Sequence, residues 1–305
     1  MTQSAIALRR GQRRVPEVDQ PGIADARLLP DPDFEAAWDS IILPDDMKAR
    51  LARNAVAGVQ LRRQVAFEAL PLHGVTLLIG PPGVGKTTVA RGLADRVART
   101  ILGQEWLFVE VDPHGLASAA LGRSQRSVEQ LFGTVLDEHA TAGPMVVLLD
   151  EVEILVTDRA RLSMEANPID VHRAVDAVLV NLDRLARRHP SVLVVATSNV
   201  ADAIDPALAS RADVIVDVPL PDQAARRRIL EDTARAVAGA FPGARYLLDS
   251  EVLEEAARVS DGLDCRRLRK AVASACGRRP DAVGDPNKVT GADLLAELAS
   301  VAVAR

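Results

Sequence analysis

The sequence is poor in the residue types on which disulfide-stapled and membrane-spanning proteins depend. It has two cysteines in 305 residues, and aromatic residues make up 3%. Cys265 and Cys276 are too few and too poorly spaced for a disulfide framework or a zinc site, so we expect reduced, buried thiols in a cytoplasmic protein. No apolar run approaches the ~18 residues that span a bilayer, and we expect no membrane partner. The core must therefore be built mainly from Ala, Val, Leu and Ile.

The charge balance gives no general attraction for polyanions. The chain has 37 Lys and Arg against 42 Asp and Glu, a formal net charge of −5. A protein that binds nucleic acid through its phosphates needs a basic surface, which this balance does not indicate. The charge balance therefore weighs against nucleic acid as a partner.

Composition and periodicity divide the chain into three parts. Residues 1–33 are rich in Pro, Asp, Arg and Gly without periodicity, and we expect an irregular tail without a signal peptide. Residues 34–221 alternate short apolar runs with helical patterns, which predicts an α/β domain with a parallel five-stranded sheet. Residues 222–305 show only helical patterns and predict a small α-helical lid domain. The strand candidates are VTLLIG (75–80), LFVEV (107–111), MVVLLD (145–150), VLVVATSN (192–199) and DVIVDV (213–218).

A glycine-rich segment follows the first strand candidate. Its sequence, GPPGVGKTT over residues 80–88, fits the phosphate-binding pattern G-x-x-x-x-G-K-[ST] between a strand and a helix. Its glycines let the backbone turn tightly around phosphate oxygens, and its prolines stiffen the loop. Lys86 supplies positive charge to the β- and γ-phosphates, and Thr87 can ligate Mg²⁺. The predicted ATP-binding residues are Gly80, Pro81, Pro82, Gly83, Val84, Gly85, Lys86, Thr87 and Thr88.

Acidic and amide side chains follow two later strands at the same edge of the predicted sheet. Asp150 ends MVVLLD and would hold Mg²⁺ together with Thr87, while Glu151 can polarise the attacking water. The alternative is that Asp150 and Glu151 merely cap a following helix. Asn199 ends VLVVATSN, where an amide could hold the lytic water, although an Asn at this place is more often a turn residue.

The stretch SNVADAIDPALASRADVIVDVPLP, residues 198–221, resembles the second region of homology of AAA+ ATPases. The resemblance implies that Asn199 is the sensor-1 residue and Arg211 an arginine finger donated to a neighbouring subunit. Without it, Arg211 would be interpreted as a surface residue. A finger that acts in trans requires a head-to-tail interface, and such interfaces close into rings.

The lid sequence DGLDCRRLRK carries a further match to the AAA+ pattern. Arg266 corresponds to the sensor-2 arginine, which implies contact with the bound nucleotide. Because Arg267 and Arg269 lie so close, a solvated surface arginine is the alternative for this position.

Further segments narrow the resemblance to the pachytene-checkpoint AAA+ ATPases. They are WDSIILPDDMKARL, LLDEVEIL and DVHRAVDAVLVNLD, and the likeness covers roughly residues 34–275. It implies a homohexamer that partly unfolds a HORMA-domain protein and converts its closed, partner-bound form to the open form. Bacterial relatives accompany HORMA proteins in CBASS anti-phage defence and keep a nucleotidyltransferase switched off.

Two features depart from the family pattern. Eukaryotic members carry a folded N-terminal domain, whereas only the irregular residues 1–33 precede the matching region here, which fits a bacterial type. The first pore loop usually has an aromatic residue, where this chain has Ala119, Ala120 and Leu121. We therefore expect the pore loop to hold a substrate strand only weakly, with Leu121 as the residue that contacts the strand.

Two other functions stay open at this point. The chain could be an AAA+ loader or translocase on nucleic acid, which DNA-stimulated ATPase activity would indicate. It could also be a scaffold whose bound nucleotide only switches assembly, which negligible turnover with retained ATP-dependent assembly would indicate. Intact Lys86, Glu151 and Arg211 weigh against the scaffold.

Overall fold

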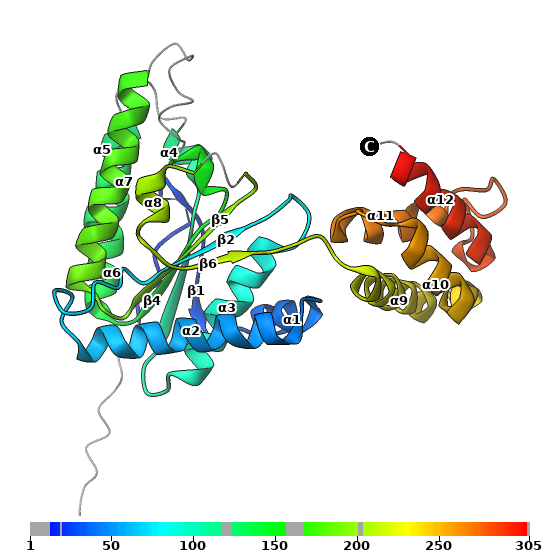
Figure 1. Ribbon diagram of the computed structural model, residues 1–305, viewed down its shortest axis with the longest axis horizontal. Coiled ribbons are helices and arrows are strands. Elements are labelled where there is room, and N and C mark those ends of the chain that lie inside the picture. Colours follow the sequence, from blue (N-terminus) through cyan, green and yellow to red (C-terminus); the bar gives the residue numbers. More distant parts are fainter. Residues whose placement is uncertain (1–12, 19, 118–123, 157–167, 201–203, 304–305) are drawn as a thin grey trace, which may run out of the picture.

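The computed structural model describes residues 13–18, 20–117, 124–156, 168–200 and 204–303. The expected pore-loop residues Ala119, Ala120 and Leu121 lie outside this part of the chain. An α/β part and a helical part are joined by the single connection between β6 and α9 (Figure 1). None of the described helices combines the length and apolarity that crossing a bilayer requires.

One sheet forms the centre of the α/β part. Across the described residues it has six strands in the order β1-β3-β4-β5-β2-β6. The strands are β1 (Ile23–Leu29), β2 (Val75–Ile79), β3 (Trp106–Val111), β4 (Met145–Leu149), β5 (Val192–Ser198) and β6 (Ala212–Asp217). The last five pair in parallel, which confirms the predicted parallel sheet.

The first strand corrects the expectation of an irregular tail over residues 1–33. β1 runs antiparallel along β3 at the edge of the sheet, so the sheet has one strand more than expected. Its ends, Ile23 and Leu29, are buried, while Asp25 and Arg27 between them form an ion pair at 2.6 Å. An edge strand can keep charged side chains in water, and this breaks the alternation that sequence analysis detects.

Helices cover both faces of the sheet, as the predicted alternation requires. Buried residues of α1, α2 and α3 pack on one face, and those of α5, η1 and α7 pack on the other. Along β4, Met145 and Val147 pack on the face covered by α5, η1 and α7, while Val146 packs on the face covered by α1, α2 and α3. Successive strand residues point to opposite faces. Among the described residues, the helices of the α/β part are α1 (Pro32–Ser40), α2 (Asp45–Gln64), α3 (Lys86–Thr100), α4 (Pro113–Ala117), α5 (Ser124–Gln130), η1 (Leu131–Leu136), α6 (Asp137–Ala142), η2 (Val152–Ile154), α7 (Pro168–Arg188) and α8 (Pro206–Ala209).

The helical part has its own buried apolar cluster. Its helices are α9 (Gln223–Ala240), η5 (Pro242–Leu248), α10 (Ser250–Val259), α11 (Cys265–Ala275), η6 (Pro286–Lys288) and α12 (Gly291–Val303). Asp222, Asp249 and Asp264 cap α9, α10 and α11 by accepting backbone N–H bonds, which fixes where each helix begins. A separate lid domain over residues 222–305 stays a prediction.

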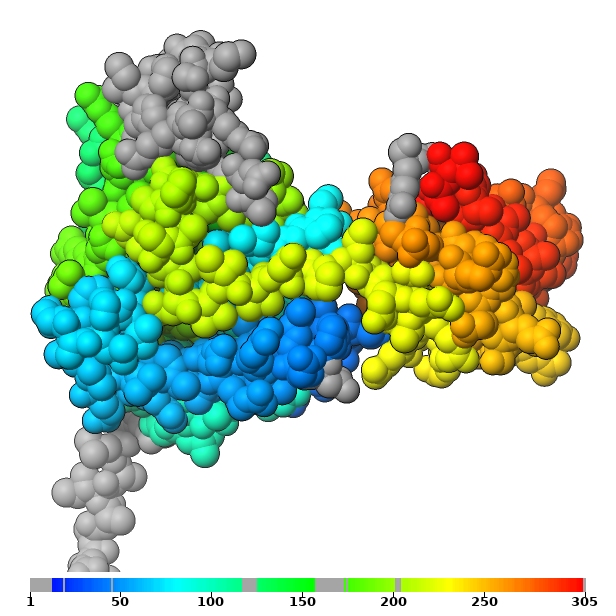
Figure 2. All heavy atoms as spheres, in the orientation of Figure 1, coloured from blue at the N-terminus to red at the C-terminus, as the bar shows by residue number. Residues whose placement is uncertain are grey.

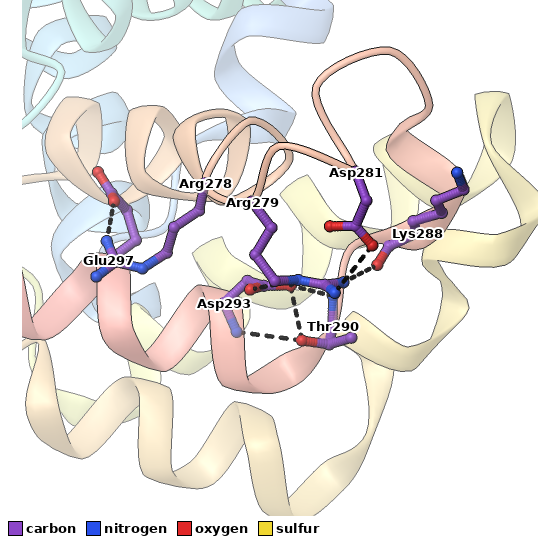
Figure 3. A network of polar contacts seen from close by, with 7 residues as sticks. All are labelled: Arg278, Arg279, Asp281, Lys288, Thr290, Asp293 and Glu297. Carbon is purple, nitrogen blue, oxygen red and sulfur yellow. Dashed lines mark hydrogen bonds and ion pairs between the residues drawn. The ribbon is translucent and has the colours of Figure 1, made fainter.

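A polar network fastens the end of the helical part (Figure 3). Arg279 donates to the Asp293 carboxylate at 3.0 Å, and the Thr290 hydroxyl donates to the same group at 2.7 Å. Nearby, Arg278 pairs with Glu297 at 2.8 Å. The segment after α11 is thereby tied to α12.

Candidate nucleotide site

The glycine-rich loop connects β2 to α3 at the carboxyl edge of the sheet. Gly83 has φ +83° and Gly85 has φ +98°, a left-handed backbone that glycine adopts without strain. A Cβ at Gly83 would also lie 2.2 Å from Oδ1 of Asp264, the residue that caps α11. The Arg266 N–H donates to the Gly83 carbonyl at 3.3 Å. The loop and the lid helix α11 thus meet at close range, where the two parts adjoin in Figure 2.

Lys86 is folded back onto the loop that precedes it. Its ammonium donates to the carbonyls of Gly80 at 2.8 Å and Pro81 at 2.9 Å, and to Oδ1 of Asn199 at 2.8 Å. Burial lowers the pKa of Lys86, while the nearby carboxylates of Glu153, Asp150 and Glu151 act in the opposite direction. The sheet and the loop together hold this cation between the ends of β2 and β5.

Asp150 forms the centre of a cluster of hydroxyl groups. The Thr87 hydroxyl lies 2.9 Å from Oδ1 and 3.0 Å from Oδ2 of the Asp150 carboxylate. This pair of oxygen donors fits Mg²⁺, which takes one or two protein oxygens and completes its shell with phosphate and water. Among the described residues, no group of three His, Cys, Asp or Glu is arranged to hold a metal ion.

Glu151 faces the same cavity from the residue after Asp150. Its Oε1 accepts from the Asn199 amide at 3.2 Å, and its Oε2 lies 3.8 Å from Nε2 of His114. The Asn199 side chain therefore joins two predicted site residues, because its carbonyl oxygen accepts from Lys86. The side-chain amide of Asn199 thus lies between the Glu151 carboxylate and the Lys86 ammonium. A terminal phosphate and its attacking water would meet in this region.

Basic side chains of α11 close the cavity from the lid. Arg266, Arg269 and Lys270 line it together with the loop. Within the described chain, none of the three side chains has a hydrogen bond or ion pair to another residue. Their charge is thus available to an anion, and Arg266 lies close enough to lower the pKa of Lys86. Sequence analysis singled out Arg266 alone, although spacings of three and four residues place all three on one helix face.

The structure brings most of the predicted site residues together in one cavity of about 370 Å³. Those that line it are Pro82, Gly83, Gly85, Lys86, Thr87, Thr88, Asp150, Glu151, Asn199 and Arg266. Gly80 and Pro81 line an adjoining hollow, and Val84 lines a second cavity. The predicted residue Arg211 lines none of these three hollows.

The second cavity, of about 440 Å³, was missed by sequence analysis. It is mostly apolar, and Val84 of the glycine-rich loop contributes to its lining. Its other walls come from the segment before α2, from the connection between β6 and α9 with the first turns of α9, and from α11. Burial raises the pKa of the Cys265 thiol in its wall, which keeps the thiol neutral. The apolar residues include Ile42, Leu43, Pro44, Pro219, Leu220 and Pro221.

Arg211 lies at the opposite end of the neighbouring strand from the glycine-rich loop. In the parallel pair of β2 and β6, Ala212 is opposite Val75 and Asp217 is opposite Ile79. Arg211 therefore lies at the start of β2, while the loop follows its end, about 17 Å away at ~3.3 Å per residue. Its guanidinium is paired with Asp183 at 2.7 Å. Arg211 cannot reach the cavity of its own chain in this arrangement.

Known proteins resemble this chain in sequence and in fold. The model of the AAA family, "ATPase family associated with various cellular activities", matches residues 76–220. CD-NTase-associated protein 6 of Pseudomonas aeruginosa is 48% identical over 269 residues, which are 88% of each protein. The pachytene checkpoint protein 2 homolog of Arabidopsis thaliana is 30% identical over 284 residues, 82% of this chain and 61% of that protein.

A solved structure shows the same fold at low sequence identity. A chain of the "E. coli MS115-1 HORMA:CdnC:Trip13 complex" superposes with a TM-score of 0.75, covering 93% of this chain and 97% of that one. At 19% identity, this likeness concerns the fold. The overall fold of this chain is thus shared with a protein of known structure.

Proposed function

Because the chain belongs to the AAA+ ATPases of the pachytene-checkpoint family, we propose that it is a ring-forming ATP hydrolase that remodels a HORMA-domain protein. One observation carries the hydrolase part of this proposal. Six side chains from several elements meet in one cavity: Lys86, Thr87, Asp150, Glu151, Asn199 and Arg266. Each has the chemistry that ATP hydrolysis needs at that place.

The residues divide the work on the triphosphate. The loop N–H groups and Lys86 bind the β- and γ-phosphates, and the lid arginine Arg266 approaches them from the opposite side. Mg²⁺, held by Thr87 and Asp150, would neutralise phosphate charge. Glu151 orients and polarises the attacking water, and the Asn199 amide holds the Glu151 carboxylate in place.

The apolar cavity next to Val84 is the place proposed for the adenine ring. Its apolar walls suit a flat heterocycle, and Val84 of the loop lines it, whereas the adjacent Gly83 and Gly85 line the phosphate cavity. Because α11 contributes to both cavities, a bound nucleotide would contact the sheet part and the helical part at once. Binding of ATP would thereby bias the angle between these parts.

Arg211 supplies the argument for a ring. It lies far from its own nucleotide cavity, so a catalytic role requires a second subunit whose cavity faces it. Head-to-tail contacts of this kind generate closed rings, and a homohexamer is the assembly proposed from the family. Arg211 would then stabilise the charge that develops on the neighbour's γ-phosphate.

The proposed partner is a HORMA-domain protein in CBASS anti-phage defence, within the cytoplasm. The 48% identical relative is named CD-NTase-associated, and a protein of the same fold was solved in a complex named with HORMA and CdnC. These names support the partner. The remodeller would convert the closed, partner-bound HORMA form to the open form and so restrain the nucleotidyltransferase.

The experiment uses a purified HORMA-domain protein bound to a labelled peptide partner. We expect the wild-type protein with ATP to release the peptide, and Glu151→Gln to hold the HORMA protein stably with ATP without releasing it. A matched control is Glu129→Gln, which changes an exposed carboxylate outside the cavity. Release that is independent of ATP, or no association in the Glu151→Gln variant, would contradict the proposal.

A further inference from the structure

One buried hydroxyl contacts both acidic residues that follow β4. Thr197 lies on β5 and is 1% exposed. Its Oγ1 donates to Oδ1 of Asp150 at 2.5 Å and accepts the backbone N–H of Glu151 at 3.1 Å. A hydroxyl has one donor hydrogen and two acceptor lone pairs, so the single donor of Thr197 is committed to Asp150. The hydroxyl thus links the residue proposed to hold the metal with the residue proposed to act on water.

The backbone of Glu151 is the reason why this link matters. Glu151 has φ +51°, and no other described residue except glycines has a positive φ. A left-handed backbone is strained for a glutamate and persists only where its surroundings fix it. The turn after β4 points the Glu151 side chain toward Asn199 instead of continuing the strand. The Thr197 hydroxyl holds the N–H at the beginning of this turn.

The Asp150 carboxylate is fixed by two hydroxyls with different expected duties. Thr87 contacts both carboxylate oxygens and is itself a proposed metal ligand, so its bonds change when a metal binds. Thr197 contacts Oδ1 alone and does so from the interior of the sheet. It can keep its bond to Asp150 whichever group occupies the cavity. Its β-branched side chain in a strand has little rotamer freedom, which favours a fixed geometry.

We infer that Thr197 is a positioning residue for ATP hydrolysis, which sets the orientation of the Asp150 carboxylate and the strained turn at Glu151 through one hydroxyl. This inference rests on the proposed function. Thr197 lines the cavity, but its hydroxyl is engaged with Asp150 and with the Glu151 N–H. It acts through Asp150 and Glu151, so its loss affects the metal-dependent part of nucleotide binding and the hydrolytic step together.

The test compares Thr197→Val, which keeps shape and loses the hydroxyl, with Thr197→Ser, which keeps the hydroxyl. Groups that orient metal ligands typically contribute about 10- to 100-fold. We expect Thr197→Val to lower kcat for ATP by that factor and Thr197→Ser to stay within about threefold of wild type. The control is Thr76→Val, the same change at a buried position of β2 outside the cavity, with kcat near wild type.

A binding measurement gives a second readout that needs no turnover. The probe is a fluorescent, non-hydrolysable ATP analogue, titrated with MgCl₂ and separately with EDTA. We expect Thr197→Val to weaken the Mg²⁺-dependent gain in affinity about tenfold or more and to leave binding in EDTA unchanged. A purely structural role would weaken both conditions alike, because packing defects do not depend on the metal.

The outcomes separate this inference from the proposed function. A wild-type protein that binds no analogue and hydrolyses no ATP overturns both. Wild-type turnover together with an unaffected Thr197→Val, or equal losses in Thr197→Val and Thr197→Ser, overturns the inference alone. If Thr197→Val does not fold, Thr197→Ser still decides, since a loss of tenfold or more in that variant contradicts the role of the hydroxyl.

Discussion

Arg211 and Asp183 form a bidentate ion pair. The pair lies near the amino-terminal end of β2, whereas the nucleotide cavity lies at the carboxyl ends of the parallel strands. Nε and Nη2 of the guanidinium donate to Oδ1 and Oδ2 of the carboxylate at 2.7 and 2.8 Å. Each partner stabilises the charge of the other: a hydrogen bond from Arg211 helps to lower the pKa of Asp183, and the same bond raises the pKa of Arg211. Nε2 of His73 lies 3.2 Å from Oδ1 of Asp183.

The ion pair leads to a prediction about Asp183. The carboxylate fixes the direction of the guanidinium that we propose to act on a neighbour, so Asp183→Asn is expected to lower kcat for ATP about tenfold with little change in KM. Steady-state ATPase assays would show this, with the exposed Asp176→Asn of the same helix as control. In an Arg211→Ala background the Asp183 change should cost nothing more. Losses that multiply would mean that Asp183 acts independently of Arg211.

Lys86 and Glu151 are predicted to separate binding from hydrolysis. Lys86→Ala removes the cation that faces the phosphates and is expected to abolish or severely weaken nucleotide binding. Glu151→Gln keeps the shape and the bond from Asn199 but cannot polarise water, so ATP should bind while turnover is lost. Nucleotide titration and ATPase assays check both. Normal turnover in Glu151→Gln would remove Glu151 from the catalytic role.

Two adjacent arginines of α11 provide a matched pair. Arg266 lines the nucleotide cavity, whereas the half-exposed Arg267 does not and instead pairs with Asp264 at 3.5 Å. We expect Arg266→Ala to weaken ATP binding or lower turnover about tenfold or more, because a charged hydrogen bond to phosphate is lost. Arg267→Ala should resemble wild type. Equal behaviour of the two variants would show that Arg266 is a solvated surface residue.

Sequence analysis predicted the parts of the site that depend on local spacing. Lys86, Thr87 and Asp150 stand in continuous motifs, and strand ends bring such motifs to one edge of a parallel sheet. Thr197 and Asp183 were missed because their contacts depend on how separate strands and helices register in three dimensions.

The missed first strand has a different cause. Charged side chains in the middle of β1, Asp25 and Arg27, hide an edge strand that only two buried residues anchor. The apolar cavity was missed because its walls come from segments that are distant in the sequence and show no common motif.

The network in Figure 3 predicts a pH dependence of stability. Burial of Asp293 by itself would raise its pKa, but bonds from Thr290 and Arg279 outweigh this and hold the pKa below its ordinary value. A carboxyl group with a lowered folded pKa contributes stability above its ordinary pKa of about 4 and loses it as the pH falls through the folded value. Asp293→Asn should therefore be less stable by about 1–3 kcal/mol at pH 7.

The measurement for this prediction is chemical unfolding of wild type and Asp293→Asn between pH 7 and pH 3. The difference in unfolding free energy should stay constant down to about pH 5 and shrink below about pH 4. Asp281→Asn, at a more exposed carboxylate of the same network, serves as control with a smaller effect. A difference that does not change with pH would contradict the assigned pKa direction.

The central claim is that one subunit's cavity works with the next subunit's Arg211, and mixing of two inactive variants tests it most directly. Arg211→Ala keeps an intact cavity, and Lys86→Ala keeps an intact guanidinium. In rings assembled from both, some interfaces pair the intact cavity with the intact Arg211. We predict that ATPase activity partly returns on mixing, while each variant alone stays inactive. No return of activity in rings proven to contain both variants would contradict the shared site.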